Sequence, residues 1–200
     1  MFPKSLVLLF PLVHATWNCG VDPDTADLEQ QANLTVRDVK VTALMTAAKA
    51  LHANRNDVVY TQGDKRWNGI DNKKMPPACP KYSDCSSAVS WMYWTVFGPR
   101  GSYPWSKDKL NGQDWKAGYT GTMTNYGKSV SKSAMKRGDL VFYGGTKSVP
   151  GHVAMYVGHD KVVSHGSDPA GCYSVDYRSD RIDIRCYFDC DSDEAEEALV

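Results

Sequence analysis

Apolar residues recur at helical spacing in two segments of the chain, which predicts two amphipathic helices. The first segment, residues 36–54, carries its apolar stripe at Val41, Leu44, Met45, Ala48 and Leu51. The second begins after Ser83 or Asp84, either of which can cap a helix, and stops at Gly98-Pro99. Its stripe is formed by Cys85, Ala88, Val89, Met92 and Val96.

The pattern changes to strand-like runs rich in Val, Tyr and Phe after Gly138. The expected strands are residues 139–143, 152–157, 161–165 and 182–187. Between the helical and strand regions, residues 64–83 are rich in Lys, Asn, Gly and Pro and are expected to be loop, and residues 99–137 to be an irregular insert or short helices. Helices first and an antiparallel sheet second predict an α+β domain.

The chain divides into one domain and three flanking segments. Residues 1–15 have the charged, apolar and small-residue regions of a secretory signal peptide, with cleavage expected after Ala15. Residues 16–35 form a polar arm, which contains a glycosylation sequon at Asn33. Residues 36–190 form the folded domain, and residues 191–200 form an acidic tail that we expect to be disordered.

Charge composition argues against a nucleic-acid partner. Lys plus Arg and Asp plus Glu number 23 each, so the chain is formally neutral and lacks the basic excess that such proteins use.

We expect a secreted, extracellular monomer with no membrane anchor once the signal peptide is removed.

Six cysteines in a secreted chain predict disulfides. If Cys85 stays reduced, five remain, and two bridges plus one spare thiol is the simplest account. The five are Cys19, Cys79, Cys172, Cys186 and Cys190. Sequence leaves the pairing open, although Cys186 and Cys190 are candidates to tie down the arm at Cys19. The spacing contains no paired C-x-x-C, so a zinc site is disfavoured and no metal is expected.

A cysteine at the start of a helix and two histidines on later strands form a candidate for nucleophilic catalysis. The first turn of a helix favours a thiolate at Cys85, and an imidazole can take its proton. If His159-Asp160 is the turn of a two-residue hairpin, His165 faces Ala154, two residues from His152. His165 would then hold the His152 ring in one tautomer.

Less specific interpretations remain open for these residues. Cys85 is equally a candidate for a buried apolar side chain or half of a disulfide. A metal site at His152, His159 and His165 is weak because His159 falls in the turn, far from the other two. Asp84 opposes a thiolate electrostatically, so a capping or substrate-binding role suits it better than activation of the thiol.

The joint pattern of four motifs resembles the NlpC-type cell-wall peptidases, a papain-like family. The motifs are Asp84-Cys85-Ser86, Gly138-Asp139-Leu140-Val141-Phe142, Gly151 to Gly158 (GHVAMYVG) and Val162-Val163-Ser164-His165. Tyr60 to Gly63 and Trp115 to Thr122 are also similar to lysin domains of actinobacterial phages.

The resemblance implies a papain-like α+β fold and a role for each matching residue. Cys85 is implied as the nucleophile, His152 as the base and His165 as the orienting residue. Tyr60 matches a tyrosine that contributes to the oxyanion site, although its usual W-G-G continuation is replaced here by Thr61-Gln62-Gly63. Asp84 and Ser86 match positions that bind the amino end of the peptide substrate.

The sequence therefore predicts a secreted cysteine peptidase that hydrolyses peptidoglycan stem peptides without a cofactor. The resemblance implies the bond between D-γ-glutamate and a diamino acid. Trp105, Trp115 and Tyr119 are candidates to line the groove. Two alternatives stay open: an amidase or acyltransferase with the same Cys-His-His set, and an inactive secreted binding protein.

Overall fold

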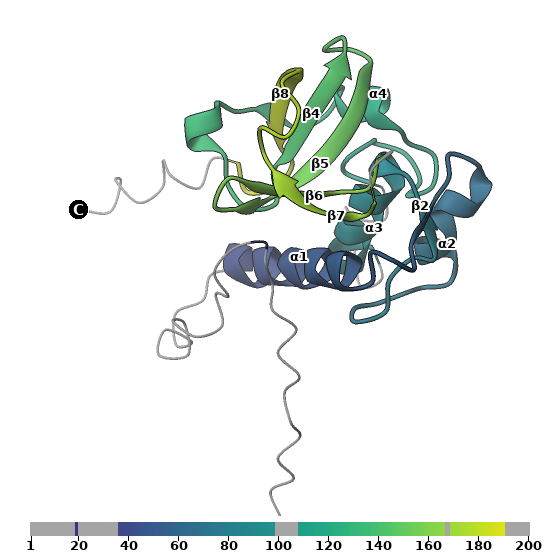
Figure 1. Cartoon of the computed structure of the whole chain (residues 1–200). Coiled ribbons are helices and arrows are strands. Elements are labelled where there is room, and N and C mark those ends of the chain that lie inside the picture. The colour runs from purple at the N-terminus through teal and green to yellow at the C-terminus, as the bar shows by residue number, and fades with distance from the viewer. Residues whose placement is uncertain (1–18, 20–35, 99–107, 167–168, 191–200) are drawn as a thin grey trace, which may run out of the picture.

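The structure is a computed structural model that describes residues 19, 36–98, 108–166 and 169–190. The predicted signal peptide, most of the polar arm with Asn33, Trp105 and the acidic tail lie outside the described residues. Within the described ranges, the fold is α+β, with helices packed against an antiparallel sheet, as the sequence predicts (Figure 1).

A six-stranded sheet forms the second half of the domain, in the order β3-β8-β4-β5-β6-β7. The strands are β3 (Lys128–Ser129), β4 (Leu140–Gly145), β5 (Pro150–Gly158), β6 (Lys161–Ser164), β7 (Gly171–Ser174) and β8 (Arg181–Cys186). Every neighbouring pair is antiparallel. The four expected strands correspond to β4, β5, β6 and β8, whereas β3, which is only two residues long, and β7 were not predicted.

Two helices cover one face of this sheet, which we call the inner face. They are α1 (Val36–Ala53) and α3 (Cys85–Phe97), and α1 runs beneath the strands in Figure 1. Phe142, Val153 and Val163 of the sheet are fully buried in the core that these helices complete. A smaller cluster with Val141 and Tyr143 occupies the opposite, outer face. Side chains alternate between the two faces along each strand.

Residues 64–83 are more structured than the predicted loop. They contain a 3-10 helix (Asp64–Trp67), α2 (Asn68–Asp71) and β2 (Tyr82–Ser83). Trp67 and Ile70 are buried and anchor these short turns to the core, which outweighs the loop-forming composition around them. β2 pairs in parallel with β1 (Val59–Tyr60), so the segment leading into α3 is fixed to the chain at Tyr60.

In the described residues 108–139, between α3 and β4, the chain forms short elements, in agreement with the expectation of an irregular insert or short helices. These are α4 (Thr120–Met123), β3 and a 3-10 helix (Lys132–Ala134). Thr120 Oγ1 donates to the Pro150 carbonyl over 2.7 Å and attaches α4 to the start of β5.

Two disulfides and two free thiols account for the six cysteines, as predicted. The bridges are Cys19–Cys172 and Cys186–Cys190, and the free cysteines are Cys79 and Cys85. The suggestion that Cys186 or Cys190 ties down the arm is wrong, because these two cysteines pair with each other and Cys172 of β7 holds Cys19.

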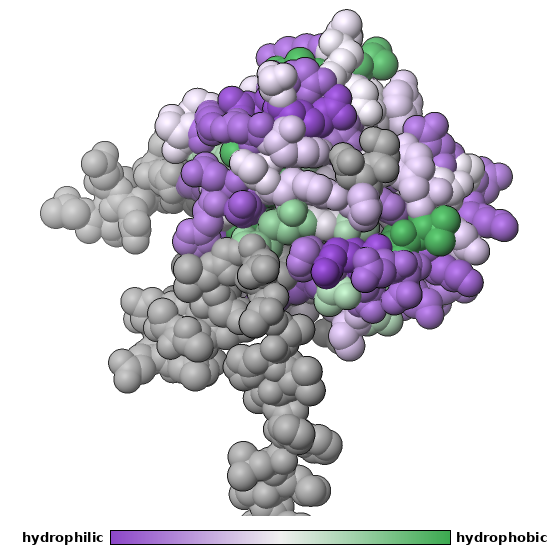
Figure 2. Space-filling view, in the orientation of Figure 1, coloured by the Kyte–Doolittle hydropathy of each residue, from purple (hydrophilic) through white to green (hydrophobic). Residues whose placement is uncertain are grey.

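The surface drawn in Figure 2 is mainly hydrophilic, with small separate hydrophobic patches. Across the described ranges, every helix is too short or too polar to span a bilayer.

Candidate active site

The start of α3 is shaped by a capping box around Asp84. The Asp84 carboxylate accepts from the Ser87 backbone N–H over 2.7 Å, and the Asp84 N–H donates to Ser87 Oγ over 2.9 Å. The predicted cap is therefore confirmed, and Cys85 is the first residue of the helix. Orphan N–H groups at this end favour an anion at the Cys85 sulfur.

The Cys85 thiol is nevertheless protonated at rest. Burial raises its pKa to about 11, and the negative charge of Asp84 acts in the same direction. Hydrogen bonds from the backbone N–H groups of Val153, Ser86 and Cys85 itself lower it in part. The contact with Val153, the residue that follows His152, places the Cys85 sulfur against β5. A base is therefore needed to form the thiolate.

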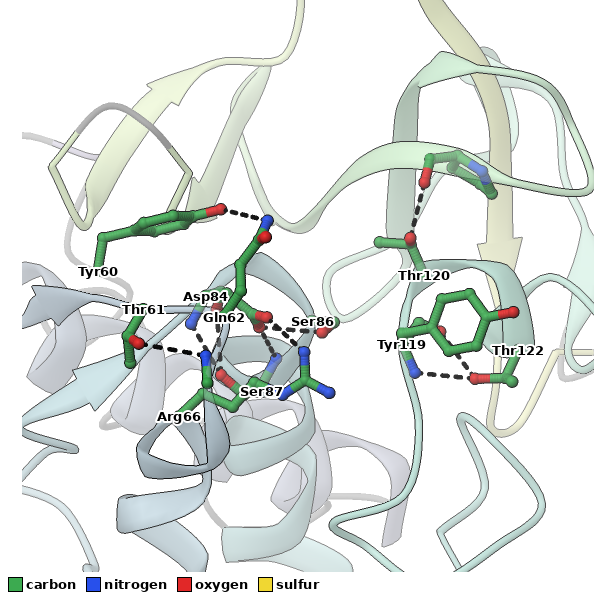
Figure 3. Close-up of polar contacts among 12 residues, drawn as sticks. Tyr60, Thr61, Gln62, Arg66, Asp84, Ser86, Ser87, Tyr119, Thr120 and Thr122 are labelled. Carbon is green, nitrogen blue, oxygen red and sulfur yellow. Dashed lines mark hydrogen bonds and ion pairs between the residues drawn. The ribbon is translucent and has the colours of Figure 1, made fainter.

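The Asp84 side chain is the centre of a largely buried polar cluster (Figure 3). Its carboxylate accepts from Arg66 Nη1 over 2.9 Å and from Ser86 Oγ over 2.9 Å. The Arg66 guanidinium also lies 4.8 Å from the Trp67 ring centre, which fixes its direction. Asp84 and Ser86, predicted to bind substrate, are thus adjacent and linked, with Arg66 as a third member.

Tyr60 lies beside this cluster, on β1. Its register partner in β2 is Ser83, two residues before Cys85, so parallel pairing brings Tyr60 to the nucleophile segment. Its hydroxyl accepts from Gln62 Nε2 over 2.9 Å, and its side chain is half-exposed. A donor at this position can reach a group bound at the surface of the site.

His152 lies near the start of β5 with its ring on the outer face. The Nε2 atom is 2.7 Å from Ser164 Oγ and 2.7 Å from the Tyr177 hydroxyl. The Tyr143 ring lies 6.0 Å away. The imidazole is 5 % exposed, so these partners define its orientation.

His165 contacts a different part of the molecule. Its Nδ1 is 2.6 Å from Ser83 Oγ, and its ring meets the Tyr60 ring edge-on at 5.5 Å. Burial lowers the pKa of His165, and the Asp84 charge opposes that effect. His165 therefore joins the end of β6 to the segment that carries Cys85.

The hairpin register that placed His165 opposite Ala154 is wrong. The turn is as expected, with His159 and Asp160 at φ of 50° and 53° and Gly158 paired with Lys161. A bulge between Tyr156 and Gly158 then shifts the pairing by one residue, so that Met155 faces Val163. Continuing that register sets Ala154 opposite Ser164, and the argument for His165 as the partner of His152 no longer holds.

Several site residues were not identified from the sequence: Arg66, Ser83, Ser164 and Tyr177. Ser83 and Ser164 each stand beside a residue that was singled out, and their importance follows from which face they occupy. Tyr177 comes from the connection after β7, and only the three-dimensional structure brings it to His152.

The aromatic residues expected in the groove behave differently from one another. Trp115 is buried, in agreement with the core role that such residues usually have. Tyr119 is exposed and stands across from the Asp84 cluster in Figure 3, next to Thr120. Tyr119 thus borders the site on the side opposite Tyr60.

In the part of the chain that the structure describes, no three His, Cys, Asp or Glu side chains group as metal ligands.

Comparison with solved structures finds similar proteins at low sequence identity. The NlpC/P60 domain of the peptidoglycan hydrolase SagA is 21% identical, with a TM-score of 0.49, and the match covers 73% of this chain and 97% of that one. NlpC1 from Trichomonas vaginalis is 14% identical, with a TM-score of 0.49, over 78% of this chain and 46% of that one.

Comparison with sequences gives a curated relative and a family. The peptidoglycan DL-endopeptidase CwlO of Bacillus licheniformis is 32% identical over 108 residues, which are 51% of this chain and 19% of the relative. The chain thus spans about a fifth of that relative's length. The sequence model of the NlpC/P60 family matches residues 65–180, more than half of the chain. The protein therefore belongs to the NlpC/P60 family.

Proposed function

We propose that this protein is a cysteine peptidase that hydrolyses peptidoglycan stem peptides. The observation that carries the proposal is the position of the free Cys85 thiol at the first residue of α3, against the backbone N–H next to His152. The family and the endopeptidase name of the Bacillus relative support the substrate class.

In the proposed reaction His152 removes the Cys85 thiol proton as the sulfur attacks a peptide carbonyl. The thiol pKa of about 11 makes this transfer necessary at neutral pH. The oxyanion that forms accepts from the Cys85 backbone N–H and the Tyr60 hydroxyl. The tetrahedral intermediate expels the amine, which takes the proton from His152, and leaves a thioester on Cys85.

Water then attacks the thioester with His152 as base. The carbonyl carbon gains the hydroxyl, the sulfur leaves as the thiol, and the peptide acid is released. Each cycle returns the enzyme to its starting state and needs no cofactor.

Substrate positioning is proposed for the Asp84 cluster. Its buried carboxylate, which is also paired with Arg66, is a suitable partner for the free amino end of a stem peptide, and Ser86 adds a hydroxyl. Recognition of an amino end next to the scissile position suits the bond between D-γ-glutamate and a diamino acid. The predicted signal peptide would direct the enzyme out of the cell that makes it, where it could reach a bacterial cell wall.

The direct test is mass spectrometry of purified peptidoglycan digested with the protein. We expect new stem-peptide termini with the wild type and none with Cys85→Ala. Cys79→Ala is the matched control, because Cys79 is the other free cysteine and should leave the products unchanged. Absence of products from folded wild type, on both diaminopimelate- and lysine-type walls, would contradict the proposal.

A further inference from the structure

The two hydroxyl oxygens at His152 Nε2 come from separate parts of the chain. Ser164 ends β6 and Tyr177 lies in the connection from β7 to β8, yet both oxygens are 2.7 Å from the same nitrogen. Gly166 closes a third side, where an added Cβ would lie 2.9 Å from His152 Cε1. The ring is thus confined by contacts at Nε2 and by packing beside Cε1.

The Ser164 hydroxyl indicates which imidazole nitrogen carries the hydrogen. Its oxygen donates to the Val153 carbonyl over 3.0 Å, and a hydroxyl has one hydrogen to give. Toward His152 the same oxygen must then accept, so Nε2 is the protonated nitrogen. The lone pair of the neutral ring is consequently on Nδ1, the nitrogen that can take the thiol proton.

Tyr177 is itself held by aromatic contacts. Its ring stacks on Tyr173 at 4.9 Å and meets Tyr143 edge-on at 5.5 Å. The Tyr143 hydroxyl donates to the Val175 carbonyl over 2.8 Å, which secures the same connection. The Tyr177 oxygen therefore has a fixed position and can share the Nε2 hydrogen with Ser164 in a three-centre bond.

Ser164 and His165 are consecutive, so their side chains point to opposite faces. Ser164 points to His152, whereas His165 points to Ser83 and Tyr60. Only one residue of the pair can contact His152, and the shifted register of β6 places Ser164, not His165, on the face of His152.

We propose that Ser164 and Tyr177 are the positioning residues that hold His152 in its Nε2-protonated form, and that His165 instead positions the Cys85 segment through Ser83. This assignment rests on the proposed function only in naming His152 as the base.

The test combines nitrogen-15 NMR of the imidazole rings with kinetics of peptidoglycan cleavage. At about pH 8 an ordinary imidazole is neutral, and the nitrogen shifts report which nitrogen is protonated. His152→Gln assigns the His152 signals. The variants are Ser164→Ala, Tyr177→Phe, the double variant, Ser164→Thr, which keeps the hydroxyl, and His165→Ala.

We expect wild-type His152 to be protonated at Nε2, and Ser164→Ala and the double variant to mix the two tautomers. Ser164→Ala and Tyr177→Phe should each lower kcat about tenfold with KM little changed, and the double variant should lower kcat further. Ser164→Thr should restore the wild-type nitrogen shifts. His165→Ala should leave the His152 tautomer as in the wild type.

A tautomer change in His165→Ala but not in the double variant would overturn the proposal and return the orienting role to His165. So would wild-type His152 protonated at Nδ1. Because Tyr177→Phe alters a half-buried side chain, it keeps the test valid if Ser164→Ala fails to fold. If the nitrogen shifts are as expected but the protein cleaves no peptidoglycan, only the proposed function is contradicted.

Discussion

His152 and His165 have different surroundings, although His165 directly follows Ser164, the residue that contacts His152. His152 lies on the outer face among Ser164, Tyr143 and Tyr177, where its neighbours are hydroxyl-bearing rings and a serine. His165 lies on the inner face against Ser83 and Tyr60, next to the cysteine segment. One strand end can therefore contact both halves of the site, because its register sends consecutive side chains to opposite faces of the sheet.

The largest effect of a substitution is expected at Cys85, the residue beside which both histidines are proposed to act. Cys85→Ala should lower kcat/KM more than about 10³-fold, because no other group replaces the nucleophile. Cleavage of a defined stem peptide, followed by chromatography, measures the effect. Cys79→Ala should retain wild-type rates, and equal loss in both variants would show that thiol removal acts through folding.

His165 is expected to contribute mainly to stability. His165→Ala removes a fully buried ring and leaves Ser83 Oγ without this partner, which should cost about 2–4 kcal/mol of unfolding free energy. Urea denaturation followed by circular dichroism measures it. The control is His159→Asn, at an exposed turn position whose positive φ asparagine tolerates, with an expected change within about 0.5 kcal/mol. Similar stabilities for the two variants would refute the structural role of His165.

The charge of Asp84 should be detectable at the sulfur. The negative charge of Asp84 raises the pKa of Cys85, so Asp84→Asn should lower that pKa below its value of about 11. The rate of iodoacetamide labelling of Cys85 should therefore rise at lower pH than in the wild type. Peptide mapping separates this label from that on Cys79, and an unchanged or upward shift would contradict the electrostatic account.

The smallest expected effect concerns a buried carboxyl far from the reaction. Burial raises the pKa of Asp139 to about 6, so the folded state favours the protonated form and loses stability as pH rises from about 4 to 6. Asp139→Asn removes that loss, and its stability relative to wild type should improve by on the order of 1–3 kcal/mol between pH 4 and 7. Thermal melts across this range test it, with Asp160→Asn in the exposed β5–β6 turn as control. A difference independent of pH would be evidence against the raised pKa.

Local signals in the sequence were sufficient for one half of the site. Asp84 caps α3 as expected because the capping partners are only three residues apart. The hairpin turn at His159-Asp160 is likewise a local feature, and its position was predicted correctly.

The other half of the site depends on contacts that are remote in sequence. The bulge near Val157 changes which face Ser164 and His165 occupy, and no residue type within the strand specifies it. Tyr177 reaches His152 across 25 positions, and Cys19 reaches Cys172 across 153. Such pairings follow from the packing of the whole domain.

Detection of the covalent intermediate is the direct test of Cys85 as the proposed nucleophile. The protein is mixed with a stem peptide that has a free amino end, quenched in acid within milliseconds to seconds, and its peptides are mapped by mass spectrometry. We expect the acyl half of the substrate as a thioester on Cys85, absent from Cys85→Ala and unaffected by Cys79→Ala. Products that accumulate with no adduct on Cys85, or with the adduct on another residue, would contradict it.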